Sequence, residues 1–215
     1  MTPDLDIVQP EEVEETTYIV SGHPRSGTSM MMKSLIAGGL KGAYRDRVSN
    51  MDPNNPDDGP RPYPKTFEYE ANPGGFYELG AGSGKFPEFP NKFIGKVIKV
   101  IYRGLPMLYP AKYKVVYMLR DPDEIALSMS RIRDGKRPMR PRRHGWSRPA
   151  DYFALMKHFI LVATNRSDME VLQVWYGDVL EDPVKAFERI KEFGIPIDPE
   201  KAAEIVTHDL YRNRA

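Results

Sequence analysis

Short apolar runs alternate along the chain with amphipathic stretches of helical period. The runs have the length and the β-branched and aromatic content of buried strands, and they cover residues 18–20, 97–101, 115–119 and 171–175. Helical patterns cover residues 30–36 and 152–163, and a third begins after Asp182 and Pro183 with Phe187, Ile190 and Phe193 on one face. Apolar strands that alternate with helices are typical of parallel sheets. The pattern therefore predicts an α/β protein with a central parallel sheet flanked by helices.

Three stretches do not fit this alternation. Residues 1–16 are expected to form an acidic flexible tail, because the first fifteen residues hold six acids and no base. An irregular insertion is predicted at about 46–96, where clusters of proline and glycine prevent regular helices and central strands. Residues 131–148 carry eight lysines and arginines and one acid, which predicts a basic loop. We therefore expect residues 17–215 to form a single domain that contains the insertion and the basic loop.

Composition argues against several classes of protein. The formal net charge is only +1, which argues against general nucleic-acid binding. There is no cysteine, so the chain has no disulfide framework and no thiolate chemistry. No apolar run approaches the roughly 20 residues of a membrane span, and no signal peptide opens the chain. We expect a cytoplasmic protein without a membrane span, or else a sequence trimmed to its catalytic domain; its oligomeric state cannot be read from the sequence.

The segment that carries the most chemical information is residues 22–29, Gly-His-Pro-Arg-Ser-Gly-Thr-Ser, which follows the first apolar run. It has the frame of a phosphate-binding loop between a strand and a helix, G-x-x-x-x-G-K-[ST]. Thr28 occupies the lysine position, and the cation is instead Arg25, inside the loop. The helix N-terminus would still present unpaired N–H groups to an anion. The loop therefore predicts a phosphorylated ligand other than a nucleoside triphosphate.

The loop resembles the 5′-phosphosulfate loop of the sulfotransferases that use 3′-phosphoadenosine 5′-phosphosulfate (PAPS). A second stretch also resembles this family: a strand that ends in Arg120 is followed by an Asp-Pro turn and a helix with Ser128. A third is the segment 174–183, in which Gly177 stands where the family usually has glutamate. The resemblance implies a P-loop NTPase-like sulfotransferase fold and PAPS as co-substrate, without a metal. It implies that the nucleotide is held by Pro24, Arg25, Ser26, Gly27, Thr28, Ser29, Arg120 and Ser128.

The same resemblance suggests which residues act in catalysis. Arg25 would neutralise charge on the leaving phosphate, and Lys99 would contact the transferring sulfuryl group. Lys99 lies within an apolar run, where an unpaired lysine is costly to bury, so it should point to an anion. Tyr102 and Arg103 stand where the family's catalytic histidine would be. We therefore expect Glu78, at the end of a glycine-rich segment, to be the general base; the next candidates are Glu70 and His23, with Glu68 also possible.

Two other functions remain open from the residues. A nucleotide or small-molecule kinase would need a lysine at position 28, where this chain has threonine. A non-catalytic protein could keep the loop to bind a nucleotide or a polyanion. The basic loop is either solvated or a flap over the 3′-phosphate or an acidic acceptor. The acceptor itself, a small molecule, glycan or lipid with a hydroxyl or amine, cannot be assigned.

Overall fold

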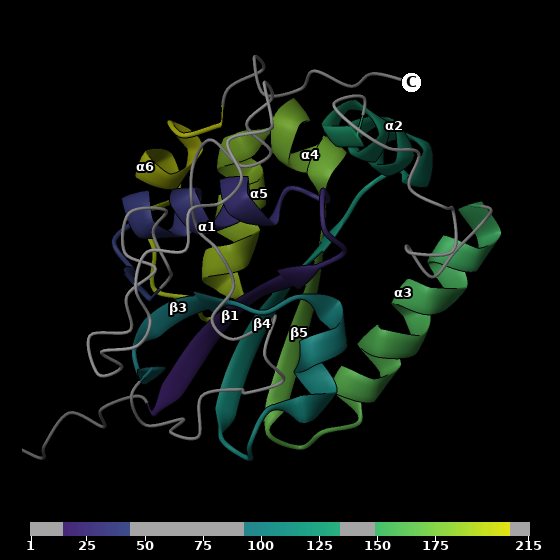
Figure 1. The fold of residues 1–215 in the computed structure, drawn as a ribbon. Coiled ribbons are helices and arrows are strands. Elements are labelled where there is room, and N and C mark those ends of the chain that lie inside the picture. Colours follow the sequence, from purple (N-terminus) through teal and green to yellow (C-terminus); the bar gives the residue numbers. More distant parts are fainter. Residues whose placement is uncertain (1–14, 44–92, 134–148, 207–215) are drawn as a thin grey trace, which may run out of the picture.

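The computed structural model describes residues 15–43, 93–133 and 149–206 (Figure 1). These residues form five strands, six α-helices and one 3₁₀ helix. In chain order the elements are β1 (Thr16–Gly22), α1 (Thr28–Ala37), β2 (Lys41–Ala43), β3 (Lys96–Lys99), η2 (Tyr102–Met107), β4 (Lys112–Leu119), α2 (Pro122–Arg133), α3 (Pro149–Thr164), β5 (Met169–Trp175), α4 (Tyr176–Glu181), α5 (Pro183–Glu192) and α6 (Pro199–Ala203).

The strands form one parallel sheet in the order β2-β3-β1-β4-β5. All seven residues of the central strand β1 are buried. Its register with β4 runs from Thr16 opposite Lys112 to Gly22 opposite Met118. The α/β class and the parallel sheet predicted from the apolar runs are therefore confirmed.

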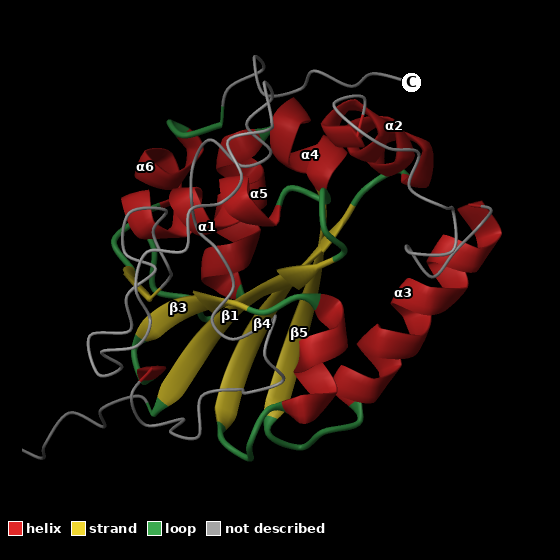
Figure 2. Cartoon of the chain, in the orientation of Figure 1, coloured by secondary structure: helices red, strands yellow, loops and turns green. Residues whose placement is uncertain are grey.

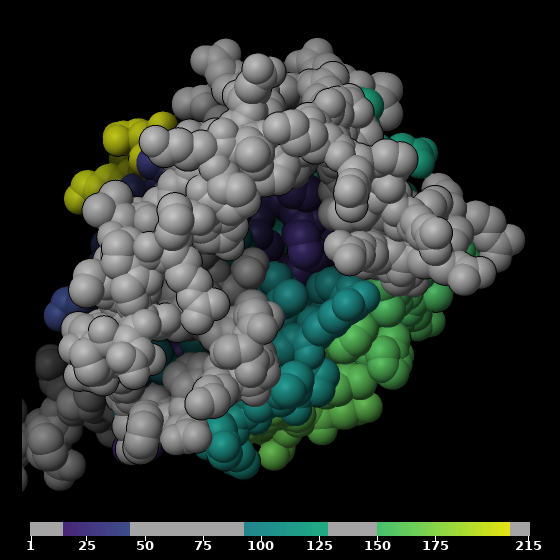
Figure 3. All heavy atoms as spheres, in the orientation of Figure 1, coloured from purple at the N-terminus to yellow at the C-terminus, as the bar shows by residue number. Residues whose placement is uncertain are grey.

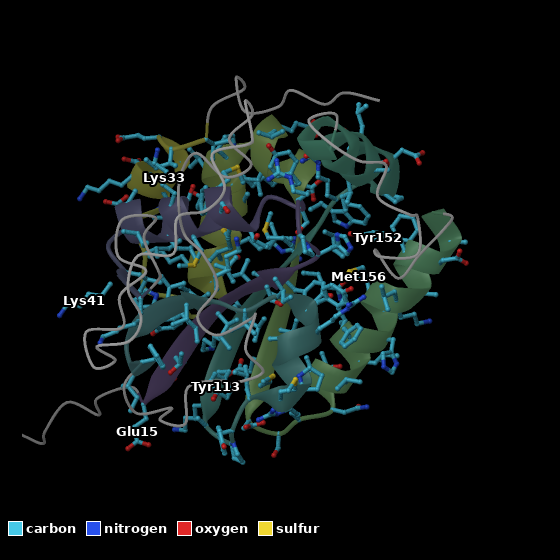
Figure 4. The ribbon with its side chains drawn as sticks, viewed as in Figure 1. Glu15, Lys33, Lys41, Tyr113, Tyr152 and Met156 are labelled. Carbon is cyan, nitrogen blue, oxygen red and sulfur yellow. The ribbon has the colours of Figure 1, made fainter. Side chains whose placement is uncertain are left out.

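Helices cover both faces of the sheet, as Figure 2 shows. Because side chains alternate along a strand, β1 contributes to two cores. Tyr18 and Val20 pack with residues of α1, α4, α5 and α6 on one face. Ile19 packs on the other face with η2 and α3. On that face, Tyr152 and Met156 lie on the side of α3 that is turned to the sheet (Figure 4), and both are almost fully buried.

The connections after the two central strands lead to opposite faces. After β1 the chain enters α1 on the first face, and after β4 it enters α2, whose Ile125 is buried in the core of the second face. Open α/β sheets bind ligands where neighbouring loops diverge in this way, at the carboxyl ends of the strands. Since β1 and β4 are neighbours, the loops that follow Gly22 and Leu119 lie at this position.

The element bounds differ from the sequence predictions in some places. Thr16, expected in the tail, is buried in β1. Residues 131–133, expected in the basic loop, form the end of α2, because no glycine or proline interrupts the chain between Pro122 and Gly135. The insertion was expected to extend to about residue 96, yet Phe93 is buried and β3 begins at Lys96. Four short elements were not predicted at all: β2, η2, α4 and α6.

At the amino end of β5, Arg166 and Asp168 bind the segment that follows η2. The Arg166 guanidinium donates from Nη1 to the Leu108 carbonyl at 2.7 Å and from Nη2 to Asp168 at 2.6 Å. Asp168 also accepts from the Ala111 N–H at 3.0 Å. The hydrogen bonds from Arg166 and Ala111 hold the pKa of Asp168 below its usual range. The pair therefore joins the segment after η2 to the start of β5.

We expect Asp168→Asn to lower the free energy of unfolding at pH 7 by about 1–2 kcal/mol, since a charged acceptor is replaced by a neutral one. The folded pKa of Asp168 is depressed, so its contribution is complete above the unfolded value of about 4 and is lost as pH falls through the folded value. Urea unfolding at pH 7 and pH 3 should show the wild-type advantage shrinking in acid. The control is Glu170→Gln, at a carboxylate that is 65% exposed and pairs with Lys114, which should be nearly neutral. An Asp168→Asn effect that is the same at both pH values would contradict the assignment.

Candidate functional site

The loop after β1 turns sharply before α1 begins at Thr28. Three of its residues have positive φ: Gly22 at 139°, Arg25 at 76° and Gly27 at 96°. The Ser26 N–H donates to the His23 carbonyl at 3.0 Å, which closes the turn. This path places the first N–H groups of α1 at the carboxyl edge of the sheet. The chain therefore forms the strand–loop–helix arrangement that the sequence predicted.

Glycine is required at two positions of this loop by close contacts. A Cβ on Gly22 would lie 2.5 Å from the Met118 carbonyl oxygen and 2.7 Å from Ser26 Oγ. A Cβ on Gly27 would overlap the ring of Tyr176. The loop is thus packed tightly against β4 and against the start of α4. Its shape is set by these neighbours as well as by its own turn.

The loop contacts a segment that lies about one hundred residues further along the chain. Arg25 Nε donates to Ser128 Oγ at 3.0 Å, and Arg120 Nη1 donates to the Arg25 carbonyl at 3.1 Å. Arg120 and Ser128 are both buried, whereas Arg25 is half-buried. The predicted binding residues of the first and second motifs are therefore brought together, at the divergence of the β1 and β4 connections.

Arg120 is held on several sides. Its Nε donates to Glu124 Oε2 at 2.8 Å, and its guanidinium carbon lies 4.4 Å from the centroid of the Tyr176 ring. Arg120 is 6% exposed and Glu124 is 8% exposed. No role was predicted for Glu124 from the sequence, because acidic residues are common in the first turn of a helix. None was predicted for Tyr176 either, although this tyrosine belongs to the third motif.

Lys99, at the end of β3, reaches the start of α1. It is 6% exposed, and its Nζ donates to Ser29 Oγ at 3.1 Å. The ammonium of Lys99 therefore lies at the loop; that it points to an anion, as expected from the sequence, stays a prediction. Ser26 is fully buried, and its Oγ has no hydrogen-bond partner among the residues that the structure describes. A buried hydroxyl of this kind at a helix N-terminus is a donor that a bound anion could use.

His23 packs into an aromatic wall. Its ring is stacked on Tyr102 at 5.5 Å and meets the edge of Tyr152 at 5.8 Å. Figure 3 shows the N-terminal segment, in purple, next to the teal segment that contains η2. His23 Nδ1 lies 2.7 Å from the Pro24 carbonyl oxygen. Because a carbonyl oxygen can only accept, this nitrogen carries the proton and donates it. Burial raises the pKa of Tyr152 to about 12 and also raises that of Tyr102, so both phenols are neutral near pH 7.

The structure thus describes most of the residues that the sequence singled out. Those present at the site are Pro24, Arg25, Ser26, Gly27, Thr28, Ser29, Lys99, Arg120 and Ser128. Glu78, the expected base, lies outside the described residues, as do Glu68, Glu70 and residues 134–148 of the basic loop. Three cations, Arg25, Lys99 and Arg120, therefore meet at one loop, and the carboxylate of Glu124 pairs with Arg120. Such a site favours an anion with more than one negative charge.

Comparisons with known proteins add no identity. No family model matches the chain, and no curated protein matches it. Within residues 15–43, 93–133 and 149–206, no cluster of histidine and acidic side chains is arranged to hold a metal ion. In the same ranges no helix has the length and apolar character needed to cross a bilayer.

Proposed function

We propose that the protein is a PAPS-dependent sulfotransferase with a P-loop NTPase-like sulfotransferase fold. The observation that carries the proposal is the contact of Arg25 with Ser128 and Arg120 where the loops after β1 and β4 diverge. The resemblance assigns Arg25 to the 5′-phosphosulfate, and it assigns Ser128 and Arg120 to the 3′-phosphate. A ligand that carries phosphates on the 3′ and 5′ oxygens of one ribose needs the two elements to be close together, and they are.

The described residues also fit the chemistry of sulfuryl transfer. In this reaction the bond between sulfur and the bridging phosphate oxygen breaks, and a bond to the acceptor oxygen or nitrogen forms. In the proposed reaction Arg25, which contacts Ser128, neutralises the leaving phosphate, and Lys99, which contacts Ser29, steadies the transferring group. The acceptor proton goes to a general base, for which Glu78 stays a prediction. The acceptor stays within the broad class of hydroxyl- or amine-bearing small molecules, glycans and lipids.

The proposal makes a direct prediction about ligand preference. The protein should bind 3′-phosphoadenosine 5′-phosphate (PAP) far more tightly than ADP, and without magnesium. At a PAP concentration of about 100 times Kd, the ligand should raise the free energy of unfolding by about 2.7 kcal/mol. Thermal unfolding with PAP, ADP or ATP, each with and without magnesium, tests this. Equal stabilisation by PAP and ADP, or binding that requires magnesium, would instead favour a kinase.

Turnover separates an enzyme from a non-catalytic binder. A sulfotransferase should move labelled sulfur from PAPS to at least one member of a panel of phenols, alcohols, sugars and amines. A protein that binds PAP tightly, yet transfers nothing across a broad panel and does not hydrolyse PAPS, would be a nucleotide-binding protein of the same fold.

A further inference from the structure

We propose that Glu124 and Tyr176 are positioning residues that hold the Arg120 guanidinium in a fixed orientation at the loop, ready for an anion. The inference rests on the proposed function only for the identity of that anion, the 3′-phosphate of the nucleotide. Neither residue needs to touch the ligand. Both act through Arg120, and each fixes a different part of the guanidinium.

Glu124 fixes the Nε side of Arg120. It lies in the first turn of α2, four residues after Arg120, and its Oε2 accepts from Nε at 2.8 Å. The side chains are 7% and 11% exposed, so the ion pair is nearly shielded from water. A buried pair of this kind restricts both side chains, because breaking it leaves a buried charge without its partner. Arg120 is therefore held at the loop and does not swing away when no ligand is bound.

Tyr176 fixes the flat face of the same guanidinium. The guanidinium carbon lies 4.4 Å from the ring centroid, within the range of a cation–π contact. Tyr176 is 3% exposed, and burial raises the pKa of its hydroxyl, so it stays neutral. The same ring occupies the space where a Cβ on Gly27 would lie. Tyr176 thus touches both the anion-binding loop and the arginine of the second motif.

The Nη side of Arg120 is then directed toward the loop, where Nη1 donates to the Arg25 carbonyl at 3.1 Å. With Nε bound to Glu124 and the ring face bound to Tyr176, the guanidinium presents its Nη groups to the same edge as Arg25 and Ser128. Fixing a flexible side chain before binding removes an ordering cost from the association. The carboxylate of Glu124 also repels an anion, so a simple deletion would mix two opposite effects.

A matched pair of variants separates these effects. Glu124→Gln and Glu124→Ala both remove the negative charge, but only glutamine keeps an oxygen that can accept from Arg120 Nε. We expect the glutamine variant to bind PAP and inorganic pyrophosphate about tenfold more tightly than the alanine variant, measured by calorimetry at one ionic strength. In an Arg120→Ala background the two variants should bind equally. A glutamine–alanine difference that persists without Arg120, or that is absent with it, would overturn the proposal.

Tyr176 supplies a second, independent measurement should Glu124→Ala fail to fold. Tyr176→Phe keeps the ring and should match the wild-type affinity for pyrophosphate, whereas Tyr176→Leu should bind it at least about threefold more weakly. Equal affinities for these two variants would remove Tyr176 from the proposal. Melting temperatures of all variants without ligand show which of them are folded.

The two ligands keep this inference distinguishable from the proposed function. If wild type binds pyrophosphate but does not prefer PAP to ADP, the sulfotransferase proposal fails, and the variants still decide whether Arg120 is positioned. If wild type binds neither pyrophosphate nor PAP, the positioning proposal is overturned too, because there is then no anion for Arg120 to hold.

Discussion

Replacing Arg25 by alanine is expected to lower turnover by about 10²–10³-fold while changing the affinity for PAP much less. The reason is that negative charge grows on the leaving phosphate in the transition state, so a cation placed there stabilises the transition state more than the bound substrate. Arg25 Nε lies 3.0 Å from Ser128 Oγ, so the guanidinium is held at the meeting point of the two motifs. The measurement is transfer of labelled sulfur from PAPS, together with a separate Kd for PAP.

Two variants control this result. Arg25→Lys keeps a cation in the loop and should retain most of the activity; both replacements adopt the same left-handed backbone, at φ 76°, so they share its strain. Arg189→Ala removes an exposed arginine on α5, away from the loop, and should leave turnover unchanged. If Arg25→Ala weakens PAP binding as much as it slows turnover, Arg25 contributes to ground-state binding rather than to the chemical step.

The sheet was predictable from the sequence, but its strand order was not. Consecutive apolar residues in β1 and β4 identify buried parallel strands, because both faces of such a strand are covered. The order of strands depends on which helix packs on which face, and the sequence carries no local signal for that. The short elements β2 and α6, with three and five residues, were missed because so few residues show no periodicity.

The candidate site was predictable where one residue's chemistry is decisive. Lys99 in an apolar run requires a polar partner, and the structure supplies Ser29 Oγ from α1. Arg120 at the end of a strand was expected at the carboxyl edge of the sheet, where it lies. Glu124 and Tyr176 were not assigned, because their roles depend on contacts with Arg120 and the loop that no local pattern reveals. The packing of His23 against Tyr102, 79 positions further along, could not be foreseen for the same reason.

Gly27→Ala is expected to lower the free energy of unfolding by about 2–4 kcal/mol, a large share of the 5–15 kcal/mol typical of a domain. Two effects add. The residue has φ 96°, where alanine is strained by about 1 kcal/mol. Its new Cβ would also overlap the buried Tyr176 ring, and overpacking of this kind typically costs about 1–3 kcal/mol. Urea unfolding followed by circular dichroism measures the loss.

The chain offers a close control in Gly39, which has φ 114° but no described atom within 4 Å of the position that a Cβ would take. Gly39→Ala should therefore show the backbone strain alone, about 1 kcal/mol. The difference between the losses of unfolding free energy in the two variants measures the cost of the overlap with Tyr176. Combining Tyr176→Leu with Gly27→Ala should restore part of the lost stability. Because the ring also supports Arg120 at 4.4 Å, Gly27→Ala should weaken anion binding as well, whereas Gly39→Ala should not. Equal losses for Gly27→Ala and Gly39→Ala would show that the loop does not press on Tyr176, and the link between the loop and Arg120 would have to be abandoned.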